Sequence, residues 1–205
     1  MRAAGAVLMV VAAILAMATA NAQTVPAQAL ERAKEIVSGR CFLCHGMQGE
    51  AASELFPRLA GQNADYVAKQ LANFQSGERA SDSMRGMVEA LTPMDMRALG
   101  EYFSRQKAEP HAVSDSRLAA AGQRVYRQGG KAAEVVACFG CHGERALGSE
   151  TLPRLAGQVA AYLETQLRRF GSRARTNDNM VMHTIAAKMT EAEIKAVAEY
   201  LSTLD

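Results

Sequence analysis

Apolar positions recur along this chain at the spacing of amphipathic helices, and the pattern occurs twice. In the first half, Leu30, Ile36 and Val37 fall on one face of a helix. We expect this helix over 27–37 and its counterpart over 118–128. No segment of the sequence shows the sustained alternation of apolar and polar residues that is typical of a half-buried strand. The pattern therefore predicts an all-helical protein.

Two further helices are predicted in each half. The last helix of each half begins at a capping residue: Thr190 with Glu193 forms a capping box, and Thr92 with Asp95 is its analogue, with Pro93 in the first turn. Another helix follows each Gly-Gln dipeptide, with apolar residues at spacing i, i+4 and i+7. These residues are Val67, Leu71 and Phe74 in the first half and Leu163, Leu167 and Phe170 in the second.

Longer stretches of sequence are duplicated too. The segment P-R-L-A-G-Q at 57–62 recurs at 153–158, which is 96 positions later. A tandem repeat of this length predicts two similar domains rather than a solenoid of short repeats. We expect the domains to span 23–109 and 115–205, with a linker over 110–114.

The N-terminus has the pattern of an export signal. Arg2 precedes an apolar run over 6–18, and Ala20-Asn21-Ala22 is an A-x-A cleavage signature. The run is shorter than the ~20 residues that a membrane span needs. We expect 1–22 to be a signal peptide and the mature protein to be periplasmic, without a transmembrane span after cleavage. The alternative is an uncleaved membrane anchor.

Composition narrows the class of protein. The chain has 205 residues, 49% hydrophobic and 21% charged, which excludes a disordered, collagenous or polytopic membrane protein. Lys and Arg number 23 against 21 Asp and Glu, so the net charge of +2 gives no indication of nucleic-acid binding. Aromatic residues are 5% of the chain and Trp is absent, so large side chains contribute little to either core.

The four cysteines form two C-x-x-C pairs, and a histidine directly follows each pair. A thioredoxin-like redox motif needs a βαβ context, which the helical pattern does not provide. A zinc site of two such pairs expects about 15–20 residues between them, whereas 93 residues intervene here. The motif C-x-x-C-H is the signature of covalent haem attachment. The residues are Cys41, Cys44 and His45, then Cys138, Cys141 and His142.

The chemistry of haem attachment explains this spacing. Two thiols three positions apart can each add to one haem vinyl group, and the next side chain then reaches the iron as its proximal ligand. We therefore expect two covalently bound haem c groups. A haem in each half would also supply the apolar mass that the scarce aromatic residues do not.

On these residues, the sequence resembles the class I cytochromes c and, more closely, the two-domain dihaem cytochromes of the cytochrome c4 type. The resemblance covers essentially the whole mature chain. It rests on the paired C-x-x-C-H motifs, the P-R-L-A-G-Q segments, the Tyr…Gln-Leu…Phe helices and the terminal Glu-Tyr helices. It implies two tandem class I cytochrome c-like domains, each with a haem held by His and Met. Dihaem subunits of some periplasmic flavin dehydrogenases look similar, so the resemblance indicates the fold better than the partner.

The resemblance implies a methionine as the second axial ligand in each half. Family members place it seven residues before the apolar residue that precedes the capping Ser or Thr, which gives Met84 and Met182. Counting forward from the P-R-L-A-G-Q segments aligns Met84 with Met180 instead. We expect Met84 rather than Met87 in the first half, and Met182 with Met180 as its alternative in the second.

Two further sets of residues receive supporting roles. Pro57 and Pro153 match the proline whose carbonyl, in cytochromes c, accepts a hydrogen bond from Nδ1 of the proximal histidine. A basic cluster in the second half could dock an acidic partner, hold haem propionates or simply be a solvated helix end. Its members are Arg168, Arg169, Arg173 and Arg175.

These residues predict an electron carrier rather than an enzyme, because two protein ligands on each iron leave no open position for a substrate. The resemblance implies a quinol-oxidising cytochrome complex as the electron donor and a terminal oxidase as the acceptor. The alternative is the electron-accepting subunit of a periplasmic flavin dehydrogenase. A peroxidase-type haem enzyme is the third possibility. The near-neutral charge favours docking through an apolar patch around a haem edge, with weak dependence on salt.

Overall fold

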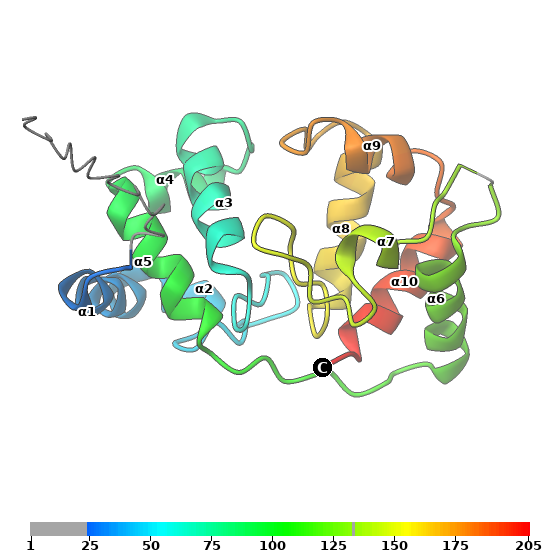
Figure 1. The fold of residues 1–205 in the computed structure, drawn as a ribbon, viewed down its shortest axis with the longest axis horizontal. Helices are drawn as coiled ribbons and strands as arrows, with labels where there is room; N and C mark the ends of the chain where they lie inside the picture. Colours follow the sequence, from blue (N-terminus) through cyan, green and yellow to red (C-terminus); the bar gives the residue numbers. More distant parts are fainter. Residues whose placement is uncertain (1–23, 133) are drawn as a thin grey trace, which may run out of the picture.

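The computed structural model describes residues 24–132 and 134–205, so the expected signal peptide at 1–22 lies outside the described residues. Within these ranges all regular secondary structure is helical, as the sequence pattern predicted. The helices form two groups that lie side by side (Figure 1). We refer to the group α1–α5 as domain 1 and to the group α6–α10 as domain 2.

Both domains contain the helices that their hydrophobic stripes predicted, together with additional short ones. In domain 1, α1 continues through a π-helical segment, η1, into α2, so the chain runs as one helical stretch to His45. The elements of domain 1 are α1 (Ala27–Ile36), η1 (Val37–Cys41), α2 (Phe42–His45), α3 (Ala64–Ser76), α4 (Asp82–Val88) and α5 (Pro93–Ser104). Those of domain 2 are α6 (Ser116–Gln128), α7 (Phe139–His142), α8 (Ala160–Gly171), α9 (Val181–Ala186) and α10 (Glu191–Ser202).

The two capping boxes are present and begin the last helix of each domain. The Thr92 hydroxyl accepts a hydrogen bond from the backbone N–H of Asp95, and the Asp95 carboxylate accepts one from the N–H of Thr92. Thr190 and Glu193 make the same reciprocal pair at the start of α10. Each box satisfies backbone donors that the first turn of a helix otherwise leaves unpaired.

In each domain the first helix packs against the last, α1 on α5 and α6 on α10. The α6–α10 contact is close at Gly122, where an added Cβ would overlap the carbonyl oxygen of Ala196. The core of domain 1 comprises Ala33, Ile36, Val37, Val88, Leu91, Met96, Ala98, Leu99 and Phe103. That of domain 2 comprises Val125, Tyr126, Ala146, Ala156, Leu163, Val197, Ala198, Tyr200 and Leu201.

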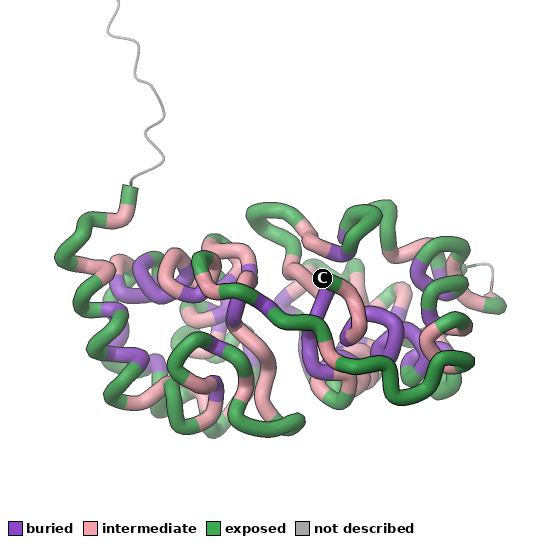
Figure 2. Tube along the Cα trace, turned by 90° about the horizontal axis from the view of Figure 1, so that it is seen from below, coloured by how far each residue is buried: buried purple, intermediate pink, exposed green. Residues whose placement is uncertain are grey.

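The two P-R-L-A-G-Q segments meet at the contact between the domains. The side-chain amide of Gln158 accepts from the backbone N–H of Arg58 (2.8 Å) and donates to its carbonyl oxygen (2.9 Å). The amide of Gln62 makes the same two bonds with the backbone of Arg154, at 2.7 and 2.8 Å. The segment that connects α5 to α6 is mostly exposed and runs along one side of both domains (Figure 2).

Candidate haem sites

The histidine of each C-x-x-C-H motif is buried and held in one orientation. His45 ends α2 and His142 ends α7, and each side chain is only 8% exposed. Nδ1 of His45 lies 3.0 Å from the carbonyl oxygen of Pro57, and Nδ1 of His142 lies 3.4 Å from that of Pro153. Since a carbonyl oxygen only accepts hydrogen bonds, Nδ1 carries the proton and Nε2 keeps its lone pair. Nε2 is therefore the atom available to a metal.

The protonation state of both histidines suits this role. Burial lowers the pKa of His45 and of His142 below the ordinary value for the side chain, and the proline carbonyls only partly offset this effect. The imidazoles are therefore neutral at neutral pH. A neutral imidazole whose other nitrogen is anchored to a carbonyl is the form that binds iron.

The two cysteines of each motif are free thiols one helical turn apart. The spacing i, i+3 puts Cys41 and Cys44 on the same face of the helical run, and likewise Cys138 and Cys141. Cys41 packs against the core of domain 1 and Cys138 against that of domain 2. Burial raises the pKa of the Cys138 thiol to about 11. Each motif thus presents two unpaired thiols and a ligand-ready histidine in a short helical segment, which is what covalent haem attachment requires.

The methionine candidates in domain 1 lie on a short helix, α4, which the sequence pattern did not predict. Met84 is half-buried and packs against the core that also contacts Cys41, whereas Met87 is 44% exposed. The Ser81 hydroxyl caps α4 by accepting from the N–H of Met84, which fixes the backbone at that residue. This burial favours Met84 as the ligand, and the assignment stays a prediction.

In domain 2 the corresponding short helix is α9. Met180 precedes it in the left-handed conformation (φ 68°) and is 38% exposed. Met182 lies in the first turn of α9, half-buried, with its N–H bonded to the Asp178 carboxylate at 2.5 Å. Burial favours Met182 over Met180, and this assignment likewise stays a prediction.

Each domain contains a buried arginine. The sequence analysis named Arg175 only as a member of the basic cluster and missed Arg79. Arg79 is 8% exposed and follows α3. Its guanidinium donates to Gln70 in its own domain at 2.8 Å and reaches across to domain 2, where it donates to Tyr162 (2.8 Å) and Gln166 (3.0 Å). The guanidinium carbon also lies 4.6 Å from the centre of the Phe74 ring.

Arg175 makes the matching contacts from domain 2. It is 6% exposed and donates to Gln166 at 2.8 Å, then across the domain contact to Tyr66 and Gln70, both at 3.0 Å. Arg79 and Arg175 are 96 positions apart, the same offset as the P-R-L-A-G-Q segments. Extending the repeat past the helices would have found them.

Neither buried arginine forms an ion pair with a carboxylate of the described residues. Burial raises the pKa of Tyr162, but the charges of Arg79 and Arg175 outweigh this effect and hold it below its ordinary value. A buried cation without a counter-ion is costly. Haem carries two propionates, which are anions of the kind that guanidinium groups bind. The buried donors therefore fit haem, and Arg79 and Arg175 would hold its propionates.

The basic cluster that the sequence indicated in the second half is not a single cluster in the structure. Arg168 is ion-paired with Glu164 and Glu191, while Arg169 donates to the carbonyl of Ala80 in domain 1. Arg173 is exposed and Arg175 is buried at the domain contact. Of the three roles considered, the propionate role fits Arg175 alone.

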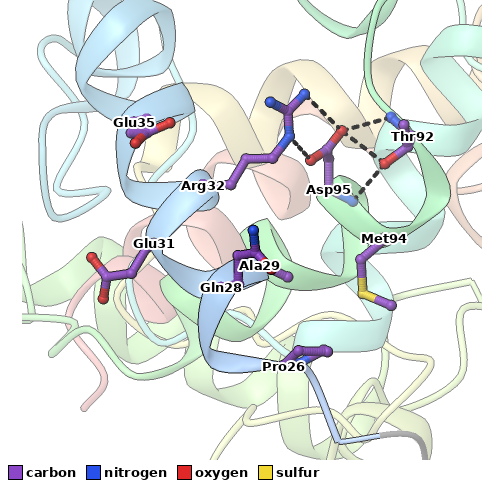
Figure 3. Close-up of a pocket in the computed structure, with 9 residues that line it drawn as sticks. All are labelled: Pro26, Gln28, Ala29, Glu31, Arg32, Glu35, Thr92, Met94 and Asp95. Carbon is purple, nitrogen blue, oxygen red and sulfur yellow. Dashed lines mark hydrogen bonds and ion pairs between the residues drawn. The ribbon is translucent and has the colours of Figure 1, made fainter.

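A surface cavity of about 550 Å³ lies between α1 and the start of α5 (Figure 3). It is crossed by the ion pair of Arg32 and Asp95, with 2.5 Å between Nε and Oδ1. The lining residues are Pro26, Gln28, Ala29, Glu31, Arg32, Glu35, Thr92, Met94 and Asp95. None of them is a cysteine or histidine of the C-x-x-C-H motifs. Across 24–132 and 134–205, no helix is long and apolar enough to span a membrane.

Comparison with known proteins agrees with this site. The cytochrome c family model matches residues 119–205. Cytochrome c4 from Thiocapsa roseopersicina is 38% identical over 171 residues, covering 82% of this chain and 88% of the relative. A thiosulfate dehydrogenase electron acceptor from Thiomonas intermedia (strain K12) is 36% identical over 194 residues, covering 92% of this chain and 89% of the relative.

A solved structure extends the likeness to three dimensions. Reduced recombinant cytochrome c4 from Pseudomonas stutzeri superimposes with a TM-score of 0.81 at 34% identity, over 86% of this chain and 98% of that one. The likeness thus covers most of this chain and nearly all of the solved one. The chain belongs to the cytochrome c4 family: it is an electron carrier with two tandem cytochrome c domains and two covalently bound haem c groups.

Proposed function

We propose that the chain carries electrons between redox proteins of the periplasm, toward a terminal oxidase, with one redox centre in each domain. The observation that carries this proposal is the repeated arrangement of a buried, neutral histidine anchored to a proline carbonyl. A bound haem supplies a one-electron iron couple. The axial ligands in this proposal are His45 and Met84 in domain 1 and His142 and Met182 in domain 2.

The residues of the chain prepare each site without taking part in bond making. Pro57 and Pro153 hold the imidazoles through Nδ1 and leave Nε2 free, and the cysteines would anchor the haem. Met84 and Met182 lie on the short helices α4 and α9 and would supply a thioether, a ligand that raises the reduction potential. Because both histidines are already buried and held by a proline carbonyl, little reorganisation of these ligands accompanies a change in charge.

This ligand set supports a carrier rather than an enzyme. A haem enzyme needs one open coordination position for its substrate, whereas a histidine and a methionine together fill both axial positions. Binding of carbon monoxide to the reduced native protein tests this point. We expect no binding at neutral pH. Stoichiometric binding to one haem would instead support a peroxidase-type enzyme.

A second candidate function has support from relatives of this chain. The Thiomonas intermedia protein is named a thiosulfate dehydrogenase electron acceptor, and it matches 92% of this chain. In this alternative the chain accepts electrons directly from a periplasmic dehydrogenase, which performs the catalysis. The sequence suggested the same role with a flavin dehydrogenase as the electron donor, and the two alternatives differ only in that donor.

Stopped-flow kinetics separates the two candidates. The native dihaem protein is reduced and mixed with membranes containing a terminal oxidase, and separately is oxidised and mixed with a thiosulfate dehydrogenase and thiosulfate. Rapid oxidation by the oxidase is the result we expect. Failure to react with any oxidase, together with rapid reduction in the second experiment, would assign the chain to the dehydrogenase.

The processing and boundaries of the chain are also part of this proposal. Cleavage after Ala22 would release a periplasmic protein with domains over 23–109 and 115–205 and a linker over 110–114. Mass spectrometry of the exported protein tests the cleavage site, because it would detect a chain beginning at Gln23 that carries two haems. Retention of residues 1–22 would support the membrane-anchor alternative.

A further inference from the structure

The first helix of domain 2 has an exposed face on which every charged residue is basic. Arg117, Arg124 and Arg127 fall within an arc of about 80° on α6 and extend over about 15 Å along its axis. All three are exposed, and α6 contains no acidic residue. Within the described residues none of the three forms an ion pair. We call these three residues the α6 stripe.

The equivalent helix of domain 1 carries no such surface. On α1, Arg32 is paired with Asp95 at 2.5 Å and Lys34 with Glu31 at 2.8 Å. Glu31 and Glu35 lie on α1 beside Arg32, as Figure 3 shows. The basic charge of α1 is therefore compensated within domain 1, whereas that of α6 is free to act on another molecule.

The α6 stripe leads to the haem-attachment segment of domain 2. Tyr126, next to Arg127, is buried and donates from its hydroxyl to the carbonyl of Gly143 at 2.6 Å, directly after His142. The N–H of Gly130 donates to the carbonyl of Val135 at 2.9 Å. This bond holds Val135, which lies three residues before Cys138, next to the end of α6. Figure 1 shows α6 at the outer end of domain 2, with this connection turning back to α7.

Apolar side chains are exposed where the connection reaches the motif. Val136 is 54% and Phe139 is 38% exposed, on either side of Cys138. The end of α6 is therefore hydrogen-bonded to the segment that carries these apolar side chains and the second attachment motif. Electron transfer requires a partner to approach the haem, and nearby charges can steer that approach.

We propose that domain 2 exchanges electrons with a protein whose docking face is rich in carboxylates, and that the α6 stripe guides this protein to the second haem. The proposal deepens the electron-carrier function and rests on it. Guanidinium groups pair with carboxylates in bidentate geometry. An anionic membrane would bind the same charges, but it would cover the exposed apolar side chains that a partner needs, so a protein is the occupant that the surface favours.

The test uses the native dihaem protein, after a pyridine-haemochrome assay has shown that both haems are present. The reduced protein is oxidised with hexacyanoferrate(III), a small anion, in a stopped-flow instrument at low and high ionic strength. The test variant combines Arg117→Gln, Arg124→Gln and Arg127→Gln. The control variant combines Lys34→Gln, Lys69→Gln and Arg97→Gln, which removes the same charge from exposed positions of domain 1.

We expect the test variant to react at least about threefold more slowly than the native protein at low ionic strength. The control variant should react at nearly the native rate, and high salt should remove the difference. This salt dependence is stronger than the near-neutral net charge alone predicts, because the α6 stripe concentrates charge locally. Polyglutamate, a carboxylate-rich competitor, should slow the native protein and the control variant but not the test variant. Equal slowing of both variants would overturn the proposal, because only net charge would then matter.

A second measurement separates a protein partner from a lipid surface. Sedimentation with phosphatidylglycerol vesicles should leave the native protein largely in solution. Vesicle binding that depends on the α6 stripe, with no competition by polyglutamate, would overturn the proposal in favour of a membrane. A chain that lacks haem, or that cannot be reduced and reoxidised, would fail earlier and would refute the electron-carrier function itself.

Discussion

The two domains form the same site from different approaches to the attachment motif. In domain 1 the chain passes from α1 through η1 into α2 without leaving helical conformation. In domain 2, α6 ends at Gly129, whose φ is 92°, and an irregular connection leads to α7. Both routes place a buried histidine beside a proline carbonyl. The duplicated chain has thus kept the site and changed the surface around it, so the domains differ in what they can dock.

The largest expected effect comes from the histidines that the two domains share. Replacing His45 or His142 with Ala removes the proximal ligand of one haem. We expect each variant to lose the normal spectrum of one haem and to keep that of the other, because each domain has its own core. Optical and resonance Raman spectra would check this. Loss of both signals in either variant would show that the domains are interdependent.

The methionines test whether the sixth ligand is equally well placed in both domains. Met84→Ala and Met182→Ala should each abolish the sulfur-to-iron charge-transfer band of one haem and open that iron to carbon monoxide. The matched controls are the more exposed Met87→Ala and Met180→Ala, which should keep both bands. If Met180→Ala removes the second band, the ligand of domain 2 is Met180 and our assignment is wrong.

Helix packing in domain 2 depends on one glycine. A side chain at Gly122 would overlap the carbonyl oxygen of Ala196 on α10. We expect Gly122→Val to lower the free energy of unfolding by about 3 kcal/mol, since helices in a packed core cannot separate freely. Gly39→Ala is the control because no atom lies within 4 Å of its added Cβ. Denaturant unfolding followed by circular dichroism would measure both, and equal stabilities would contradict the packing argument.

The buried arginines distinguish haem-bound from haem-free protein. With propionates present, Arg175→Gln should lower the free energy of unfolding by about 2 kcal/mol, because a charged hydrogen bond is lost. It should also lower the reduction potential of a haem, since a positive charge near the iron favours the reduced state. Arg173→Gln, at an exposed position, should change neither quantity. An unchanged potential in Arg175→Gln would place the propionates elsewhere.

The smallest effect concerns the capping carboxylates. Hydrogen bonds from Thr190 hold the pKa of Glu193 below its ordinary value of 4.5, and burial only partly opposes them. Glu193 therefore stabilises the fold above pH 4.5, and this contribution disappears as the pH falls through the lowered pKa. Glu193→Gln should cost about 1 kcal/mol at pH 7 and less at pH 3. Thermal unfolding at both values would check this, and a constant difference would refute it.

The sequence predicted the long helices because each has a periodic stripe and a clear beginning. α5 begins at Pro93 and α10 at Glu191, directly after the capping threonines. The short helices α4 and α9 were missed because one or two turns cannot show a stripe, so the methionines appeared to lie in loops. Arg79, and the burial of Arg175, were missed for another reason. Their partners belong partly to the other domain, and no local pattern reports such a contact.

The reciprocal hydrogen bonds of Gln62 and Gln158 across the domain contact bear on how this molecule could have evolved. Each glutamine binds the backbone of the opposite domain at the equivalent position. A contact in which the same patch serves both sides is isologous, as in a twofold homodimer. Such an interface is available to two separate copies of one ancestral domain. Gene fusion would then have made a dimer permanent, after which each copy was free to acquire its own outer surface.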